Sequence, residues 1–487
     1  MRLSRHGFAR AIFGWTPEEH KISSTSWLDG VRGLAAFLVV MSHYSMEWLS
    51  TYADAPFGAL VLKDRAVDDV WYFYEGQRLL APWRLPILRV FMCNGGGQVA
   101  VFFVISGFVL TWKPLSLAQA GNYDKLYTSL GSSTFRRWSR LYMPCAIVTL
   151  LYLLETQIKH YQGLRPLLYS FWEYLGDVEI WTNPFKTVDE KSFSTMLGLN
   201  GVVWTIPFEF GGSIFVYALT LALGRVQNFP RRILCIVLVT IYALFSLQWD
   251  LWLFGTGMVL ADYTRHSIYR TKQLSRSKST IWWSCLLLGL FLLSFVPPET
   301  TYNSYTTPIY DLSVYLPLPP GWREKVGEFR FWWGAGATLI IASACHLRQV
   351  QQFFETAFLQ HLGKISFMLY LIHLLVGNLI SGTVRPLLYA AFCNYEADPA
   401  FDIQVCRISP LLNTAIIISL WCITLPPLFA VAHFLEVYVD RPVTLLGKRV
   451  DDTLLNGWQS WGGEEKQHIE QALLLESQDV DEMQMRP

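Results

Sequence analysis

Long apolar blocks recur along the whole chain and decide its predicted fold. Each is close to the span of about 17–25 residues that a helix needs to cross a bilayer, and none alternates with the period of a half-buried strand. The pattern predicts an all-α, polytopic transmembrane bundle of about ten helices. It leaves open whether one of the two short central blocks is re-entrant. The blocks cover residues 27–48, 91–112, 141–158, 202–223, 233–248, 250–264, 281–296, 329–346, 362–383 and 411–438.

The composition agrees with a membrane protein. Hydrophobic residues make up 52% of the chain and charged residues 16%, against about 25% charged residues in a soluble domain. The net charge of +1 says nothing about a nucleic-acid partner, and the chain has no basic, aromatic-interleaved motif. We expect a lipid bilayer and no nucleic acid as partner. The first block carries Asp29 and Arg32 without a small-residue cleavage pattern, so we expect it to stay as a spanning helix.

Basic clusters predict the orientation. Lys and Arg concentrate in the cytoplasmic loops of membrane proteins, and here they cluster within 113–140, 224–232 and 262–280. With these segments inside, both termini are predicted to be cytoplasmic. The predicted parts are a lead-in over 1–26, a transmembrane domain over 27–445 and a polar tail over 446–487. Pro442 is expected to end the last helix at the inner surface.

The cysteines indicate no metal site. The chain has eight, and no C-x-x-C pair occurs among them, so a zinc site is not expected. Cys393 and Cys406 share one predicted outer loop. They form a disulfide if that face is lumenal or extracellular, or stay as two free thiols.

A cation and an imidazole share the first block. Arg32 and His43 are eleven residues apart, which on a helix puts them on one face about 16 Å apart. Ionisable groups at membrane depth normally face the bundle interior. Arg32 either serves a site or extends to the headgroups, and His43 either serves a site, contacts Glu47 four residues on, or bonds a backbone carbonyl.

Other polar residues interrupt later blocks. Ser106 and Gly107 either allow close helix packing or border a passage into which Ser106 donates a hydrogen bond. Glu209 either orients His43 or an acceptor, or forms an internal pair with an Arg. His373 either bonds a neighbouring helix or contacts a substrate.

Seven stretches of the chain form an ordered set of motifs. They are LDGVRGLAAFLVVMSH (28–43), VAVFFVISGFVLT (99–111), FRRWSRLYMP (135–144), WTIPFEF (204–210), FGTGMVLA (254–261), LGKISFMLYLIH (362–373) and VDRPV (439–443). Their order and spacing resemble those of the acyltransferase 3 family of membrane O-acyltransferases. The resemblance covers about 27–445, with Pro207, Phe367 and Asp440 as local departures, and the aromatic outer loops are more similar to fungal members than to bacterial ones.

The resemblance implies an enzyme that moves an acyl group, expected to be acetyl, from acyl-CoA to a hydroxyl, with no permanently bound cofactor. His43 would be the general base, with Arg32 and Glu209 as further catalytic residues. Arg136, Arg137, Arg140 and Ser106 would hold the acyl carrier, because Arg binds phosphate through two parallel hydrogen bonds. The alternative for the three arginines is the positive-inside bias alone.

The acceptor and the membrane stay open at this stage. A small natural product of secondary metabolism and a cell-surface glycan or lipid-linked sugar are both compatible with the resemblance, in the endoplasmic reticulum or the plasma membrane. A transporter or flippase would also place charges inside a bundle, although we find no internal repeat. A non-catalytic scaffold would have no use for Arg32, His43 and Glu209 in apolar helices.

Overall fold

A computed structural model describes most of the chain. The description covers residues 23–49, 55–59, 65–67, 70–73, 80–159, 164–183, 199–268, 276–296, 318–319, 321–322, 327–392, 394–398, 403–407 and 410–456.

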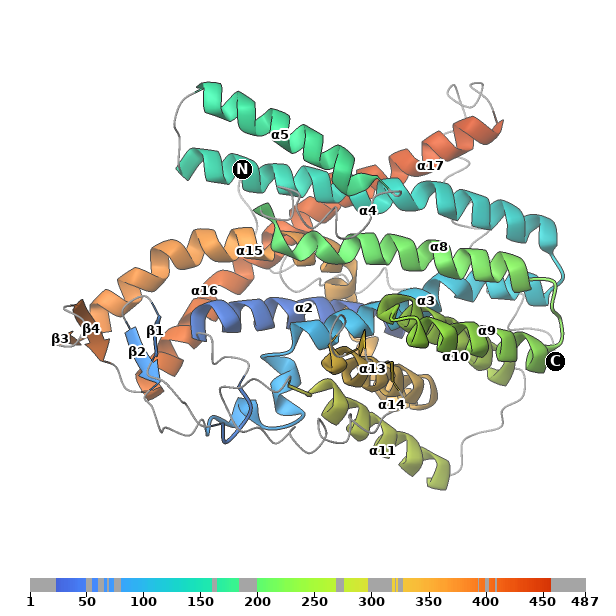
Figure 1. Ribbon diagram of the computed structural model, residues 1–487, viewed down its shortest axis with the longest axis horizontal. Helices are drawn as coiled ribbons and strands as arrows, with labels where there is room; N and C mark the ends of the chain where they lie inside the picture. The colour runs from blue at the N-terminus through green and yellow to red at the C-terminus, as the bar shows by residue number, and fades with distance from the viewer. Residues whose placement is uncertain are drawn as a thin grey trace.

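Helices make up nearly all of the described chain, and many of them run along its longest axis (Figure 1). Each of the ten apolar blocks lies largely within one helix. The helices are α2 (Ser26–Leu49), α3 (Gly95–Gln119), α4 (Tyr123–Lys159), α5 (Leu164–Thr182), α8 (Thr205–Leu223), α9 (Phe229–Phe245), α10 (Trp249–Ile268), α11 (Arg276–Leu293), α13 (Glu328–His346), α14 (Arg348–Phe354), α15 (Ala357–Phe392), α16 (Pro410–Leu435) and α17 (Arg441–Asn456), with 3-10 turns η1 (Pro82–Arg84), η2 (Leu88–Phe91) and η3 (Gly201–Trp204).

Five described helical segments are long and apolar enough to cross a membrane, which makes the chain an integral membrane protein. Helix α2 is not among them, because Asp29, Arg32 and His43 lower its hydropathy. The count of ten spanning helices therefore stays a prediction. The five segments are Gly95–Gln119, Tyr123–Lys159, Gly201–Leu223, Ala357–Phe392 and Leu412–Leu454.

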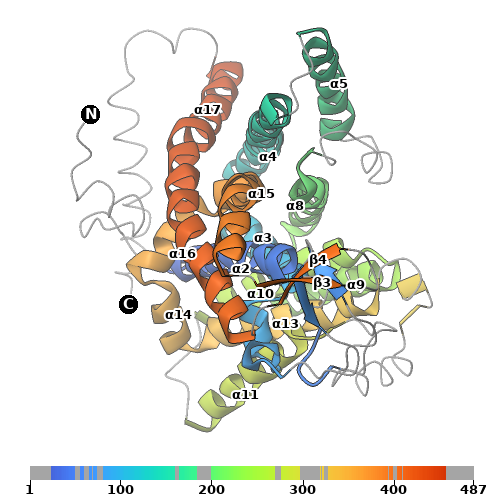
Figure 2. The ribbon, with the colours of Figure 1, turned by 90° about the vertical axis from the view of Figure 1, so that its left-hand side faces the viewer.

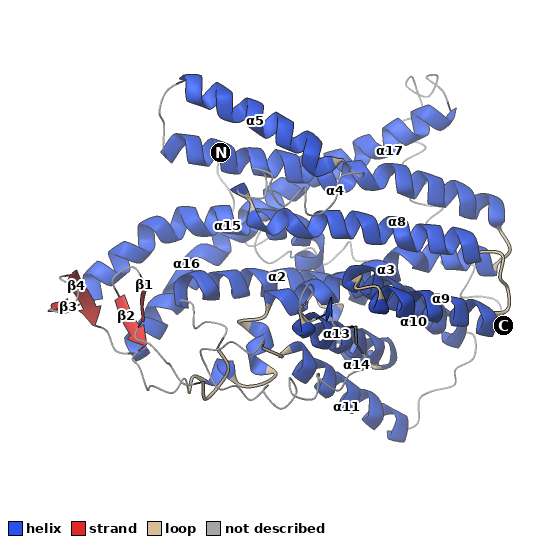
Figure 3. Cartoon of the chain, in the orientation of Figure 1, coloured by secondary structure: helices blue, strands red, loops and turns tan. Residues whose placement is uncertain are grey.

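A small sheet that the sequence analysis did not predict accompanies the helical bundle. Strands β1 (Arg65–Val67), β2 (Val70–Phe73), β3 (Asn394–Asp398) and β4 (Ile403–Arg407) pair in the order β1-β2-β4-β3. Two antiparallel hairpins are joined by parallel pairing of Val70 with Cys406. Figure 3 shows the strands together at one end of the bundle. Strands of three to five residues carry little periodicity of their own, so the sequence did not reveal them.

Helix α2 lies at the centre of the packing (Figure 2). It contributes buried residues to both large apolar clusters, one shared with α4, α15 and α16 and the other with α3, α10 and α13. It contacts α15 so closely that a Cβ added at Gly33 would overlap the backbone of Gly363. Arg32 contacts Gly363 and His43 contacts His373, so the two helices run in the same direction.

Ser106 and Gly107, which are neighbours on α3, have separate roles. Gly107 allows α3 to touch α10, since a Cβ there would overlap the carbonyl of Phe254, and a Cβ at Gly257 would overlap that of Val104. Close packing is therefore confirmed for Gly107. Ser106 faces another direction and lines a cavity.

Two predicted boundaries are corrected. The inner segment predicted over 113–140 is almost entirely helical, because α3 continues to Gln119 and α4 begins at Tyr123. The last spanning helix does not end at 440–442: α16 continues through one π-helical turn, η5 (Glu436–Asp440), into α17. Pro442 is the second residue of α17 and directly follows this π-helical turn, a common place for a residue that cannot donate a backbone hydrogen bond.

Three predictions fall on undescribed residues. Cys393 lies outside the described residues, so the disulfide with Cys406 stays a prediction. Residues 1–22 and 457–487 also lie outside them, as do the ends of the chain whose cytoplasmic location was predicted.

Candidate functional site

A cavity of about 200 Å³ brings together polar residues from six elements far apart in the sequence. Its wall is otherwise apolar, with Val99, Phe102, Phe103, Leu141, Ile206 and Phe367. Its charged and hydroxyl groups come from α2 (Arg32), α3 (Ser106), α4 (Arg137 and Arg140), η5 (Asp440), α8 (Thr205 and Glu209) and α15 (Lys364, Ser366 and Tyr370).

Helical periodicity separates the three arginines that were predicted to hold the acyl carrier. Arg137 and Arg140 are three residues apart on α4 and line the cavity together. Arg136 points away from it: its Nε lies 3.5 Å from a carboxylate oxygen of Asp451 on α17 and donates to the carbonyl of Ser132. The structure thus brings two of the three arginines into the site.

Glu209 lies against Arg137, and neither His43 nor His373 is among its hydrogen-bond partners. Its Oε2 is 3.3 Å from Nη2 of Arg137, and its Oε1 accepts from Ser106 at 3.2 Å. Arg137 also donates to Ser213 at 2.8 Å. These contacts fix Arg137 in one orientation and match the ion-pair alternative for Glu209.

Arg32 is held at the edge of the cavity by α2 and α15. Its Nη2 lies 2.9 Å from the Asp29 carboxylate and donates to the carbonyl of Gly363 at 3.2 Å. The guanidinium is only partly buried, so donors remain for a further anionic group. Lys364 on α15, which the sequence analysis did not single out, is a further cation in the cavity lining.

His43 pairs with His373, and this partner was not predicted. Nδ1 of His43 lies 2.7 Å from Nε2 of His373, with ring centroids 5.0 Å apart and planes inclined by 10°. Those values describe an edge-to-edge N–H···N hydrogen bond rather than face stacking. Glu47, one of the alternative partners considered for His43, accepts a hydrogen bond from Ser381 at 3.2 Å.

The partners of His373 assign both tautomers. Nδ1 of His373 lies 2.8 Å from the carbonyl of Tyr370, which can only accept, so Nδ1 carries the proton. Nε2 of His373 is then an acceptor, and Nδ1 of His43 must donate to it. The lone pair of His43 is therefore on Nε2, which makes that atom the basic one.

Two tyrosines and an asparagine hold His373 in place. Tyr44 donates to the carbonyl of His373 at 2.8 Å. The Tyr152 hydroxyl bridges two backbone groups one turn apart on α15: it donates to the Leu371 carbonyl and accepts from the Leu375 N–H, each at 3.0 Å. Asn200 donates to the same Leu371 carbonyl at 3.1 Å. Ordinary tyrosines in apolar helices carry no sequence signal for this role.

The histidine pair adjoins the cavity at Tyr370. The Tyr370 ring lies 6.2 Å from that of His373 and 6.3 Å from that of Phe102, and both Tyr370 and Phe102 line the cavity. His43 itself is half-buried and does not belong to the lining. The basic groups and the histidine pair thus occupy successive levels of α2 and α15. Among the described residues, no group of three or more His, Cys, Asp or Glu could hold a metal ion.

The chain is similar to known proteins over most of its length. An acyltransferase domain profile of the acyltransferase 3 family matches residues 25–433. The O-acetyltransferase PaAT-1 of Phomopsis amygdali is 28% identical over 75% of each chain. Acyltransferase clz18 of Cochliobolus lunatus and acyltransferase R4 of a Phoma species are 24% and 23% identical, each over 72% of this chain and 82% of the relative. No solved structure matches.

Proposed function

Because the chain belongs to the acyltransferase 3 family and is an acyltransferase, we propose that it moves an acetyl group from acetyl-CoA to a hydroxyl of a small natural product. The similarity to fungal proteins named O-acetyltransferase and acyltransferase supports a role in fungal secondary metabolism. Transferase membership removes the transporter and scaffold alternatives.

The charge of the large cavity is the observation that carries the proposal. Arg32, Arg137, Arg140 and Lys364 face two carboxylates, those of Glu209 and Asp440. The excess of cations suits the phosphates of a CoA ester. With Arg137 and Arg140 at the predicted cytoplasmic edge of the apolar part of α4, the pantetheine arm would extend along α2 toward His43, over about 16 Å.

His43 would act as general base through Nε2. It removes the proton of the acceptor hydroxyl as the oxygen attacks the thioester carbonyl. The C–O bond forms, the C–S bond breaks, and the CoA sulfur leaves and takes up the proton from His43. The hydrogen bond from His43 Nδ1 to His373 keeps Nε2 aimed and unprotonated. Ser106, Glu209 and Arg32 would orient the donor from the cavity.

The proposal includes a topology. We propose ten spanning helices with both termini cytoplasmic, in the endoplasmic reticulum or the plasma membrane. The common direction of α2 and α15 supports it, because both blocks are predicted to run from the inner to the outer face. A cytoplasmic start of α2 places Arg32 on the side where acetyl-CoA is present.

Deletion of the gene with mass comparison of extracts tests the function. One metabolite should lose the mass of an acetyl group in place of a hydrogen, and purified protein with acetyl-CoA should restore it. A loss confined to a cell-surface glycan or lipid-linked sugar would assign the acceptor to that class instead. Unchanged metabolites and glycans would contradict the proposal.

A further inference from the structure

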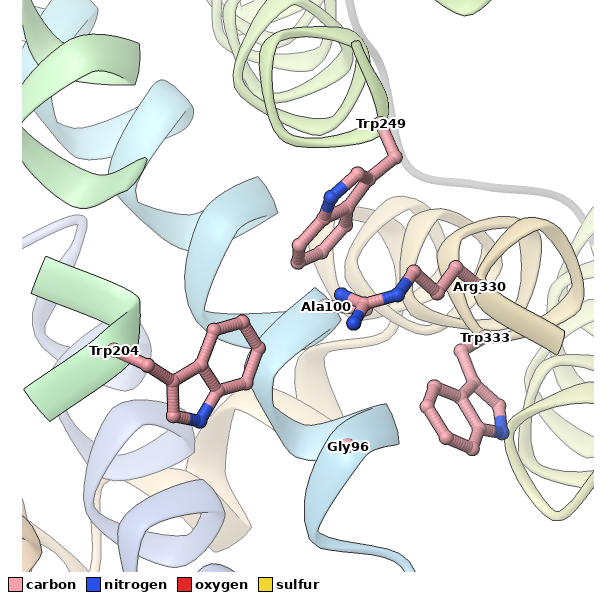
Figure 4. Close-up of a pocket in the computed structure, with 6 residues that line it drawn as sticks. All are labelled: Gly96, Ala100, Trp204, Trp249, Arg330 and Trp333. Atoms are coloured by element: carbon pink, nitrogen blue, oxygen red, sulfur yellow. The ribbon is translucent and has the colours of Figure 1, made fainter. Parts of the chain in front are cut away.

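A second, smaller cavity of about 60 Å³ lies on another side of α3. Figure 4 shows Arg330 extending toward the rings of Trp204 and Trp249. Trp333 and the backbone of α3 close the space. The lining residues are Gly96, Ala100, Trp204, Trp249, Arg330 and Trp333.

The donors of this cavity have no acceptor among the described residues. The Arg330 guanidinium carbon lies 4.3 Å from the Trp249 ring centre and 5.5 Å from that of Trp204. Within the part of the chain that the structure describes, the guanidinium forms no hydrogen bond and no ion pair. Asp250 attracts it only at longer range. The indole N–H groups of Trp204 and Trp249 likewise have no acceptor in that part.

Size and chemistry select the ligand class. A planar guanidinium binds a carboxylate through two parallel hydrogen bonds, and indole N–H groups donate to the same oxygens. The aromatic walls suit the short apolar stem behind such a group. The space is small because Trp333 fills the site of a side chain at position 96: a Cβ on Gly96 would overlap its ring. The cavity therefore fits one carboxylate with a few attached carbons.

The cavity lies at the same end of α3 as His43. Ser42, next to His43, accepts a hydrogen bond from the backbone N–H of Gly95 at 2.9 Å, and Gly96 begins the cavity wall. Phe103 packs against Trp249 at 5.1 Å and also lines the large cavity. The two cavities thus share a wall formed by Phe103 and Trp249.

We propose that the Arg330 cavity binds a carboxylate group of the acceptor and so helps to present the acceptor hydroxyl to His43. The proposal rests on the proposed transferase function for its biological meaning. Binding itself requires no acyl donor and is testable without turnover.

Propanoate is the probe for the cavity. The full-length protein in detergent is titrated with sodium propanoate against sodium chloride at equal ionic strength, and the melting temperature is followed. Propanoate should raise the melting temperature of the native protein in a saturable way. Arg330→Gln should abolish the increase, and Arg330→Lys should weaken propanoate binding about tenfold by removing the two-point contact. Saturable stabilisation that survives unchanged in both variants, or no stabilisation of the native protein, overturns the proposal.

Matched variants separate binding from folding. Arg385, whose guanidinium lies 5.6 Å from the Tyr389 ring centre on α15, is the control arginine, and Arg385→Gln should respond to propanoate like the native protein. If Arg330→Gln does not fold, Trp249→Phe decides, because it keeps the ring and removes one donor. It should weaken propanoate binding several-fold, and an unchanged affinity contradicts the proposal.

The acceptor assignment has its own test. The metabolite that loses an acetyl group on gene deletion should carry a carboxylate. Its methyl ester should be acetylated with a higher KM than the acid by the native enzyme, whereas Arg330→Gln should acetylate the acid and the ester with the same KM. A neutral acceptor overturns the acceptor assignment. Absence of any transferase activity would refute the proposed function while leaving propanoate binding as a separate result.

Discussion

At the residue scale, the site depends on which nitrogen of His43 carries a proton. The Tyr370 carbonyl assigns the proton of His373 to Nδ1, and the hydrogen bond between the histidines then places the His43 lone pair on Nε2. A chain of neutral hydrogen bonds suits a buried site, where an unpaired imidazolium would be costly. His373 is thereby a positioning residue and His43 the proposed base.

Substitution of the two histidines should separate these roles. His43→Ala should lower kcat for acetyl transfer about 100-fold or more, since general-base contributions have that size. His373→Asn should cause a smaller loss in kcat with little change in the KM for acetyl-CoA, because the base remains but is less well oriented.

A structural histidine supplies the control. His346 on α13 bonds the Ala342 carbonyl and stacks on Trp282 away from the site, and His346→Ala should keep kcat. Full activity of His43→Ala in assays of isolated membranes would rule out the proposed base.

At the element scale, the periodicity of α4 places neighbouring arginines on different faces of the helix. Arg140 lines the cavity and forms no hydrogen bond or ion pair among the described residues, whereas Arg136 binds Asp451. Arg140→Gln should raise the KM for acetyl-CoA about tenfold, the effect of losing a charged hydrogen bond, with an unchanged melting temperature. Arg136→Gln should leave that KM as it is, and equal effects of the two variants on the KM would contradict phosphate binding in the cavity.

The contact between α3 and α10 gives a stability prediction. Gly107→Ala should lower the free energy of unfolding by about 1–3 kcal/mol, because the added methyl meets the backbone carbonyl of Phe254. Gly131→Ala on α4 is the matched control, since nothing lies near that position, and it should be neutral or stabilising by about 0.5–1 kcal/mol. Thermal unfolding in detergent compares the two, and equal melting temperatures would show that α3 and α10 do not meet as described.

At the scale of the whole molecule, the direction of the helices can be tested. Epitope tags at both ends should become accessible to antibody when only the plasma membrane is permeabilised, because both termini are predicted to be cytoplasmic. A tag inserted at residue 60, in a predicted outer loop, should need full permeabilisation if the protein lies in the endoplasmic reticulum, and no permeabilisation if it lies in the plasma membrane. Termini on opposite sides of the membrane would contradict the proposed topology. The placement of Arg32 on the same side as cytosolic acetyl-CoA would then lose its support.

The amino-acid sequence by itself determined the helical bundle and one face of α2. Apolar blocks of membrane-spanning length must satisfy their backbone hydrogen bonds internally, so helices were the expected solution. The periodicity of one helix likewise sufficed to put Arg32 and His43 on a common face, and both contact α15. Both inferences use only residues close together in the chain.

Only the tertiary structure decided which distant groups meet. His43 and His373 are 330 residues apart, and nothing in either segment names the other as a partner. The same holds for Glu209 with Arg137, for Tyr152 inserted into α15, and for the sheet that joins β2 to β4. Local periodicity fixes the direction in which a side chain points, but the packing of whole helices fixes what it finds there.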